Sequence, residues 1–177
     1  MKHLLIIILV FFGCAAPQAD RPKFSPPQEW TLFQTSEDLR EFFGEAYSTD
    51  MQWAIVKNDR SAYIVVKVEE YTINLSGAAL DDAVTRFLEA VFEKKRNVFG
   101  MYDYTYAIYD GAIQRGDRLI ATEKFRDFVD GVECDSTSNI LFYRCGSKSC
   151  FTFVSMTSLP DETEASLPVL SAATESF

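Results

Sequence analysis

The hydrophobic pattern changes its period at about residue 100, and this change limits the fold more than any other feature of the sequence. Residues 78–96 carry apolar side chains at i, i+4, i+7, i+8, i+11 and i+12, which predicts an amphipathic helix. From residue 102 onward, apolar and polar residues alternate instead, which predicts strands. Strands on both sides of one long helix, without regular strand–helix alternation, favour an α+β fold with a mostly antiparallel sheet.

The other elements follow from the same two periods. A short strand at 30–33 precedes a helix that Thr35 or Ser36 can cap. Further strands are predicted at 51–56, 63–73, 102–109, 119–128, 139–145 and 150–157, and a short helix within 160–177 with Ser166 as its cap and Pro168 in its first turn. In the strand at 63–73, alternate residues from Ile64 to Val68 form an apolar face, while the opposite face mixes apolar and charged residues.

The N-terminal segment has the pattern of an export signal. A positively charged start precedes an uncharged apolar run at 4–12, which is too short to be a spanning helix, and then Gly13 and Cys14. This ending resembles a bacterial lipobox, in which the cysteine is lipidated and becomes the mature N-terminus. The alternative is an ordinary signal peptide that is cut near Ala16 or Ala19.

The resemblance to lipoproteins implies where the protein is located. We expect residues 1–13 to be the signal peptide, residues 14–28 to form a proline-rich tether, and residues 29–177 to form a single domain. Because Ala15 rather than Asp follows the cysteine, the resemblance also implies transfer to the outer membrane, with the domain facing the periplasm. The predicted membrane contact is the lipid on Cys14.

Composition and charge exclude several classes of function. The chain has 17 Lys and Arg against 26 Asp and Glu, a net charge of -9, which argues against nucleic-acid binding. The only histidine, His3, lies in the predicted signal peptide, so the exported protein would have no imidazole. That excludes Ser-His-Asp and Cys-His catalysis and histidine metal sites. We expect neither a metal nor a cofactor.

Three cysteines remain besides the one in the lipobox. Cys145 and Cys150 flank a four-residue turn between two predicted strands, and an exported compartment permits disulfides. We predict a structural disulfide between them, which contributes roughly 2 kcal/mol in the chain-entropy model. Cys134 is left over, and it is either buried or competes for a partner.

Four acidic residues crowd the sequence around Gly131. Asp127, Asp130, Glu133 and Asp135 do not have the spacing of a calcium-binding loop. We therefore interpret them as part of a solvated turn.

A row of tyrosines is the clearest candidate for a binding surface. Alternation places Tyr102, Tyr104 and Tyr106 on one face of a strand, and Ile108 continues the row. Tyrosine combines an apolar ring with a polar tip, so it suits both the margin of a core and a recognition surface. Either a helix covers this face, or part of the row stays open as a partner-binding patch.

The order of elements is similar to the PsbP-like fold, which the oxygen-evolving-complex subunit shares with small bacterial envelope lipoproteins of the DcrB type. The stretch that carries this resemblance is a strand at 151–157, then an acidic loop and a short helix that ends Ser176-Phe177. The resemblance implies an α+β sandwich in which two or three helices pack on the sheet. It also implies binding and assembly roles, with no catalytic motif to transfer.

These observations favour binding over catalysis. We expect a lipid-anchored envelope protein that acts as a non-catalytic binding or assembly accessory factor, with an envelope protein or a small ligand as its partner. The alternatives are a histidine-free hydrolase that uses Asp, Glu, Ser and Tyr, and a carrier of a small apolar ligand. A deep pocket with two convergent carboxylates would favour the hydrolase, a closed apolar cavity the carrier, and a shallow groove with exposed aromatic residues the binding protein.

Overall fold

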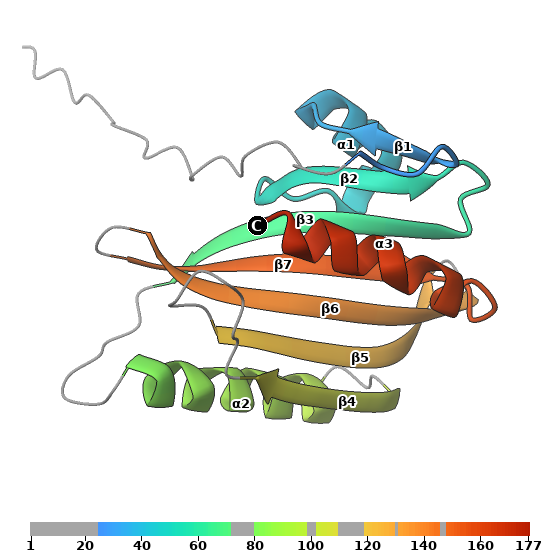
Figure 1. Cartoon of the computed structure of the whole chain (residues 1–177). Helices are drawn as coiled ribbons and strands as arrows, with labels where there is room; N and C mark the ends of the chain where they lie inside the picture. Colours follow the sequence, from blue (N-terminus) through green and yellow to red (C-terminus); the bar gives the residue numbers. More distant parts are fainter. Residues whose placement is uncertain (1–24, 72–79, 99–101, 110–118, 130, 146–147) are drawn as a thin grey trace, which may run out of the picture.

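Seven antiparallel strands form one sheet in the described part of the chain, and three α-helices pack on its faces (Figure 1). This computed structural model describes residues 25–71, 80–98, 102–109, 119–129, 131–145 and 148–177. The elements are β1 (Trp30–Phe33), α1 (Ser36–Phe43), a 3-10 turn (Gly44–Ala46), β2 (Met51–Lys57), β3 (Ala62–Tyr71), α2 (Leu80–Val98), β4 (Tyr102–Tyr109), β5 (Leu119–Val129), β6 (Val132–Cys145), β7 (Lys148–Ser158) and α3 (Thr163–Glu175). The predicted α+β class with a mostly antiparallel sheet is confirmed.

The last strand in the chain lies near the middle of the sheet. The strand order is β1-β2-β3-β7-β6-β5-β4, so β7 is inserted between β3 and β6. It pairs with β3 from Ala62 opposite Ser158 to Tyr71 opposite Ser149, and with β6 along its other edge. The strands before and after α2 are therefore joined through the pairing of β3 with β7 alone.

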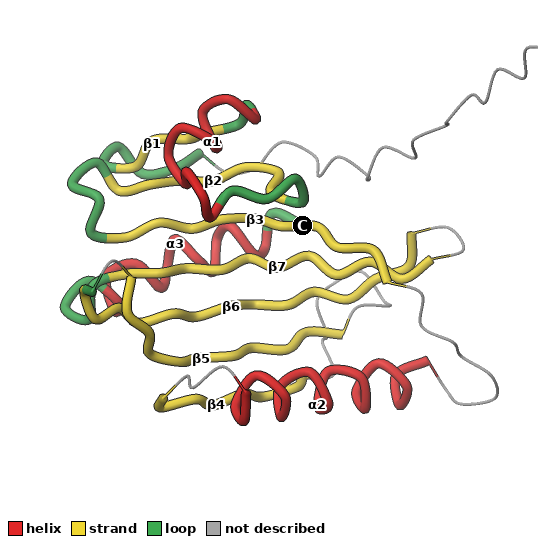
Figure 2. Tube along the Cα trace, turned by 180° about the vertical axis from the view of Figure 1, so that it is seen from behind, coloured by secondary structure: helices red, strands yellow, loops and turns green. Residues whose placement is uncertain are grey.

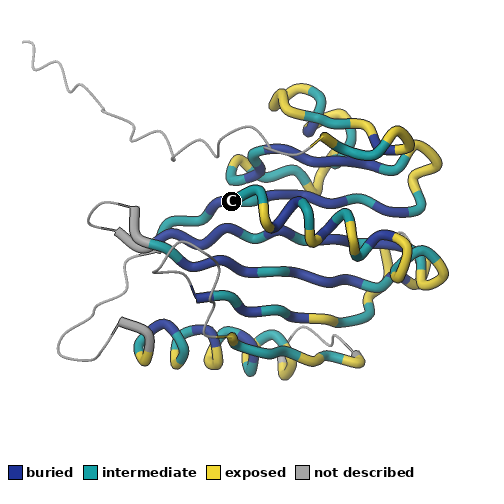
Figure 3. The backbone as a smooth tube through the Cα atoms, in the orientation of Figure 1, coloured by how far each residue is buried: buried dark blue, intermediate teal, exposed yellow. Residues whose placement is uncertain are grey.

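Helix α3 covers one face of the sheet and closes the larger core beneath it (Figure 3). The predicted apolar face of β3 is confirmed, since Ile64, Val66 and Val68 are all buried. Residues from five strands and α3 complete this cluster: Trp30, Trp53, Ile55, Ala62, Leu141, Val154, Met156, Leu170 and Ala173. Phe177 stacks on Trp53 with ring centroids 6.1 Å apart.

Helices α1 and α2 lie on the opposite face, at different ends of the sheet (Figure 2). Helix α1 buries Leu39 against Met51, Ala54 and Val65. Of the two predicted caps, Thr35 and Ser36, the structure has Thr35 at the N-cap. Its hydroxyl accepts a hydrogen bond from the Asp38 N–H at 3.1 Å. Helix α2 buries its apolar stripe against β4–β7, where the packed residues are Val84, Leu88, Phe92, Leu119, Ala121, Ile140, Phe142 and Phe151.

Helix α3 starts earlier than the sequence predicts, so the predicted cap is wrong. Ser166 is buried inside the helix and Pro168 lies inside it too, while Glu162 is at the N-cap position. The Thr163 hydroxyl, at the first helical residue, is 2.9 Å from an Asp135 carboxylate oxygen and 3.0 Å from the Ser158 hydroxyl. These contacts fix the start of the helix one turn before the proline.

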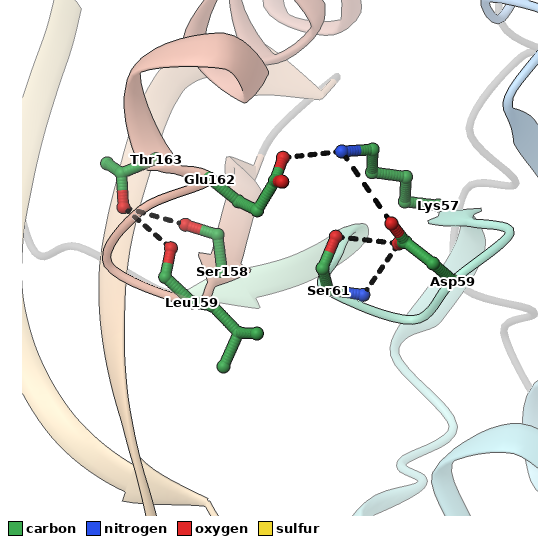
Figure 4. Close-up of polar contacts among 7 residues, drawn as sticks. All are labelled: Lys57, Asp59, Ser61, Ser158, Leu159, Glu162 and Thr163. Atoms are coloured by element: carbon green, nitrogen blue, oxygen red, sulfur yellow. Dashed lines mark hydrogen bonds and ion pairs between the residues drawn. The ribbon is translucent and has the colours of Figure 1, made fainter.

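The same corner of the molecule is tied to the turn between β2 and β3 (Figure 4). The Lys57 ammonium forms an ion pair with Glu162, just before α3, and lies 3.9 Å from Asp59. Asp59 in turn accepts hydrogen bonds from the backbone N–H and the hydroxyl of Ser61. The contact ties the start of α3, which lies over β3 and β7, to the first part of the sheet.

The acidic segment around Gly131 is a strand pair and not only a turn, which corrects the prediction. Strand β6 begins at Val132, before the predicted start, and Asp127, Glu133 and Asp135 lie on strands β5 and β6. Arg126 on β5 forms ion pairs with two of these carboxylates and with Asp103 on β4. Its guanidinium lies 3.0 Å from Asp135, 3.5 Å from Glu133 and 3.6 Å from Asp103. Asp130 is outside the described residues.

The cysteines are only partly described. Cys134 is free and buried, and Cys150 is disulfide-bonded. In the β6–β7 register Cys150 lies opposite Tyr143, and Cys145 lies opposite Lys148. The side chain of Cys145 is outside the described residues, so its pairing with Cys150 stays a prediction.

Leu141 offers a test of the core beneath α3. Because its side chain is 0% exposed, Leu141→Ala should lower the free energy of unfolding by about 2–5 kcal/mol. Val129→Ala, at a position that is 39% exposed, is the control and should change it by less than about 0.5 kcal/mol. Urea unfolding followed by tryptophan fluorescence measures both. Equal effects of the two substitutions would contradict the placement of this core.

Candidate functional site

On the face of the sheet that carries α1 and α2, no helix covers the strands between these two helices (Figure 2). A groove lies on these strands. Its volume is about 330 Å³, and residues of β3, β5, β6 and β7 line it. Phe43 and Ala46 belong to the wall on the α1 side, and Lys95 of α2 belongs to the opposite wall. The groove therefore joins elements that are far apart in the sequence.

Hydroxyl groups line the floor of this groove. Ser136 and Ser138 come from β6, and Thr157 and Ser155 lie directly opposite them on β7. The Ser138 hydroxyl donates a hydrogen bond to the Ser155 oxygen at 2.9 Å, and the hydroxyls of Ser136 and Thr157 are 3.3 Å apart. Hydrogen bonds between hydroxyl side chains thus join the two strands along the floor of the groove.

The same face becomes apolar further along these two strands. Beyond the serines β6 carries Ile140 and Phe142, and β7 carries Phe151 and Phe153 at the facing positions. Helix α2 packs on this apolar part, where Phe92 is completely buried. Since a helix gains from burying apolar surface and not from desolvating hydroxyls, α2 covers the apolar rows and leaves the hydroxyl rows as the groove.

A buried carboxylate marks the boundary between the covered rows and the groove. Glu123 of β5 is only 2% exposed, and both of its oxygens accept hydrogen bonds from the Lys95 ammonium, at 2.7 and 3.0 Å. The Tyr104 hydroxyl donates a third bond to it at 2.9 Å. Burial, followed by the negative charge of Glu123 and the hydrogen bond to it, raises the pKa of Tyr104 well above its usual value.

Aromatic rings flank the hydroxyl floor on both sides. On the α1 side the rings of Phe43 and Tyr63 meet edge to face, with centroids 5.4 Å apart. On the α2 side Phe125 stacks on Tyr104 at 6.2 Å, and Phe153 lies 6.0 Å below the Lys95 ammonium. A molecule in the groove would therefore meet apolar ring surface at its sides and hydroxyls beneath it.

The structure separates the predicted tyrosine row. Helix α2 packs over Tyr104 and Tyr106, and the Tyr106 ring lies 4.6 Å from that of Phe92. A bulge with a positive φ at Asp103 interrupts the predicted alternation, so Tyr102 takes a register position opposite Arg126. The side chain of Tyr102 is outside the described residues, and so is Cys14. A binding role for these residues stays a prediction.

Most of the groove residues were not identified from the sequence. The mixed face of β3 was recognised, and it contributes Val65, Lys67 and Glu69 to the groove. Ser136 and Ser138 were missed because the strand was predicted to begin only at 139. Ser136 and Ser138 alternate with Asp135, Thr137 and Asn139, but every residue of this segment is polar. Without an apolar face, the alternation does not indicate a strand or which of its faces is covered.

Comparison with known proteins finds likeness in fold. No family model and no curated protein matches the chain. The crystal structure of LpqN, involved in cell envelope biogenesis of Mycobacterium tuberculosis, matches with a TM-score of 0.54 and 13% identity, over 83% of this chain and 76% of LpqN. The solution structure of cyanobacterial PsbP (CyanoP) from Synechocystis sp. PCC 6803 matches with a TM-score of 0.40 and 14% identity, over 85% of this chain and 82% of that one. This chain thus shares the fold of LpqN.

Tyr104 tests the packing that limits the groove. Tyr104→Ala removes a ring that packs on α2 and on Phe125, and it should destabilise the fold by at least about 2 kcal/mol. Tyr104→Phe keeps the ring and loses only the hydrogen bond to Glu123, so it should cost about 1–3 kcal/mol and less than the alanine variant. Chemical unfolding of both variants measures the difference. An alanine variant with unchanged melting behaviour would contradict this packing.

Proposed function

We propose that this protein is a lipid-anchored protein of the bacterial envelope that binds a ligand in the groove between α1 and α2 without catalysing a reaction. The groove is the observation that carries the proposal, because it combines an uncovered sheet face, a hydroxyl floor and aromatic walls. The envelope assignment is supported by the lipobox-like Gly13-Cys14 and is compatible with the role in envelope biogenesis that LpqN has. None of the helices in the described ranges is long and apolar enough to span a membrane.

The chemistry of the groove favours binding over its two alternatives. A hydrolase of the kind considered needs carboxylates whose oxygens are available to the substrate. Of the two carboxylates that line the groove, Glu69 and Glu123, the buried one, Glu123, already has both oxygens bonded to Lys95 and one to Tyr104. At most Glu69 is then left for the substrate, whereas such a hydrolase uses two carboxylates. A carrier of an apolar molecule needs an apolar lining, whereas this lining includes serines, a threonine and two lysines.

The size of the groove limits what it can hold. Ligand pockets commonly enclose about 300–1,000 Å³. At about 330 Å³ the groove is near the lower limit of that range. We therefore propose a small molecule, or a short part of a larger one, as the ligand.

A neutral fluorescent probe tests whether the groove binds. The protein from residue 14 onward with Cys14→Ser retains every described element, and we expect it to bind N-phenyl-1-naphthylamine with increased probe fluorescence. Ser155→Phe places a ring in the groove and should weaken this binding about tenfold, equal to about 1.4 kcal/mol. Thr105→Phe, at an exposed position on the other face, is the matched control and should leave binding unchanged. Equal binding by the Ser155→Phe variant would contradict a ligand site in the groove.

Metabolic labelling tests the anchor. The full-length protein expressed in bacteria with a labelled fatty acid should carry the label, and Cys14→Ala should abolish it because the acceptor thiol is gone. Membrane fractionation of the same cultures should move the variant out of the membrane pellet. Equal labelling of both proteins would contradict lipidation at Cys14.

A further inference from the structure

The two lysines of the groove differ in their partners. Lys95 is bonded to both oxygens of Glu123. Lys67 on β3 is half-buried and forms no hydrogen bond or ion pair with any residue that the structure describes. Among the described residues, the groove therefore contains one ammonium group that is in an ion pair and one that is not.

The surroundings of Lys67 are largely apolar. In the sheet register Lys67 lies opposite Met51 on β2 and opposite Phe153 on β7. The nearest carboxylate on its own face of β3 belongs to Glu69, two residues further along the strand, and the two side chains form no ion pair. A partly desolvated ammonium group without a directly bonded counter-ion is unfavourable, so an anion that contacts Lys67 would gain a charge-assisted hydrogen bond.

A hydroxyl donor is available on the neighbouring strand. Ser155 accepts the hydrogen bond from Ser138, and its own O–H has no acceptor among the described residues. It lies opposite Val65 on β3, two residues before Lys67 on the same face. Lys67 and Ser155 are therefore two donors on adjacent strands of the floor, with apolar side chains around them.

From this arrangement we infer that the ligand of the groove is an amphipathic anion, with its acidic group at Lys67 and Ser155 and its apolar body against Phe43, Tyr63 and Phe153. The inference rests on the proposed binding function of the groove and adds the chemical class of the ligand. The net charge of -9 gives the protein no general attraction for anions, so selectivity for an anion has to come from contact with Lys67. The acidic group can belong to a free organic acid or to the headgroup end of a lipid.

Two probes that differ by one acidic group test the inference. The probe 8-anilino-1-naphthalenesulfonate has the ring system of N-phenyl-1-naphthylamine plus a sulfonate. In the protein from residue 14 onward with Cys14→Ser, Lys67→Met should weaken binding of the sulfonate probe about tenfold, because a charge-assisted contact is lost. The same substitution should change the affinity for the neutral probe by less than about twofold, since methionine keeps an apolar side chain at this position. Lys124→Met, at an exposed position on the other face, makes the same charge change and should affect neither probe.

The outcomes separate the inference from the function on which it rests. If both probes bind and Lys67→Met weakens neither, the anion specificity is wrong while groove binding stands. If neither probe binds, or if Ser155→Phe weakens the binding of neither, groove binding itself is wrong and the inference is overturned with it. Circular dichroism and the urea midpoint of each variant show that the probes report the groove and not a loosened core.

Competition identifies the source of the anion. Octanoate represents a free acid, and monomeric dihexanoyl phosphatidylglycerol represents a lipid headgroup with short chains. Displacement of the sulfonate probe by octanoate alone supports a free acid, and displacement by the phospholipid supports a lipid. Displacement by neither, at concentrations up to the solubility of each, would overturn an amphipathic anion as the ligand class.

Discussion

The bonds that Glu123 forms with Lys95 and Tyr104 anchor helix α2 where its apolar side chains pack on the sheet. A carboxylate that is almost completely buried is stable only when its oxygens are bonded, and here a lysine of α2 and a tyrosine of β4 supply the bonds. They fix the second half of α2 over β4 and β5. The strands between α1 and α2 consequently remain uncovered, and the groove exists because this helix stops where it does.

One face of the sheet carries the core under α3, and the other face carries the groove. Under α3 the buried apolar residues extend from Trp53 on β2 to Leu141 on β6, and they form the largest of the three hydrophobic clusters in the described part of the chain. The other face has apolar rows only beneath α1 and α2 and has hydroxyl rows between them. Because the period of a strand is two, changes in the groove can leave the core side of the same strands intact. Ser155 and Val154 illustrate the point, since they are neighbours in sequence and lie on opposite faces.

The order of the elements could be predicted from local patterns, but the groove could not. The helix at α2 and the apolar face of β3 depend on periodicity within one segment, which the sequence displays directly. The start of α3 depends on the contact of Thr163 with Asp135, and the shift of Tyr102 depends on a bulge against β5. The hydroxyl floor depends on pairing between β6 and β7 together with the position of α2. These are contacts between distant segments, so no local pattern contains them.

The central position of β7 has a consequence for the speed of folding. The hydrogen bonds between β3 and β7 join segments on either side of α2, β4, β5 and β6, so the chain has to close a long loop before the sheet is continuous. Proteins rich in such non-local contacts fold slowly. Until β7 docks, β3 presents a bare edge of ten residues, rich in β-branched side chains, that can pair with another unfolded chain. The yield of folded protein should therefore depend more on concentration and temperature during refolding than on the final stability.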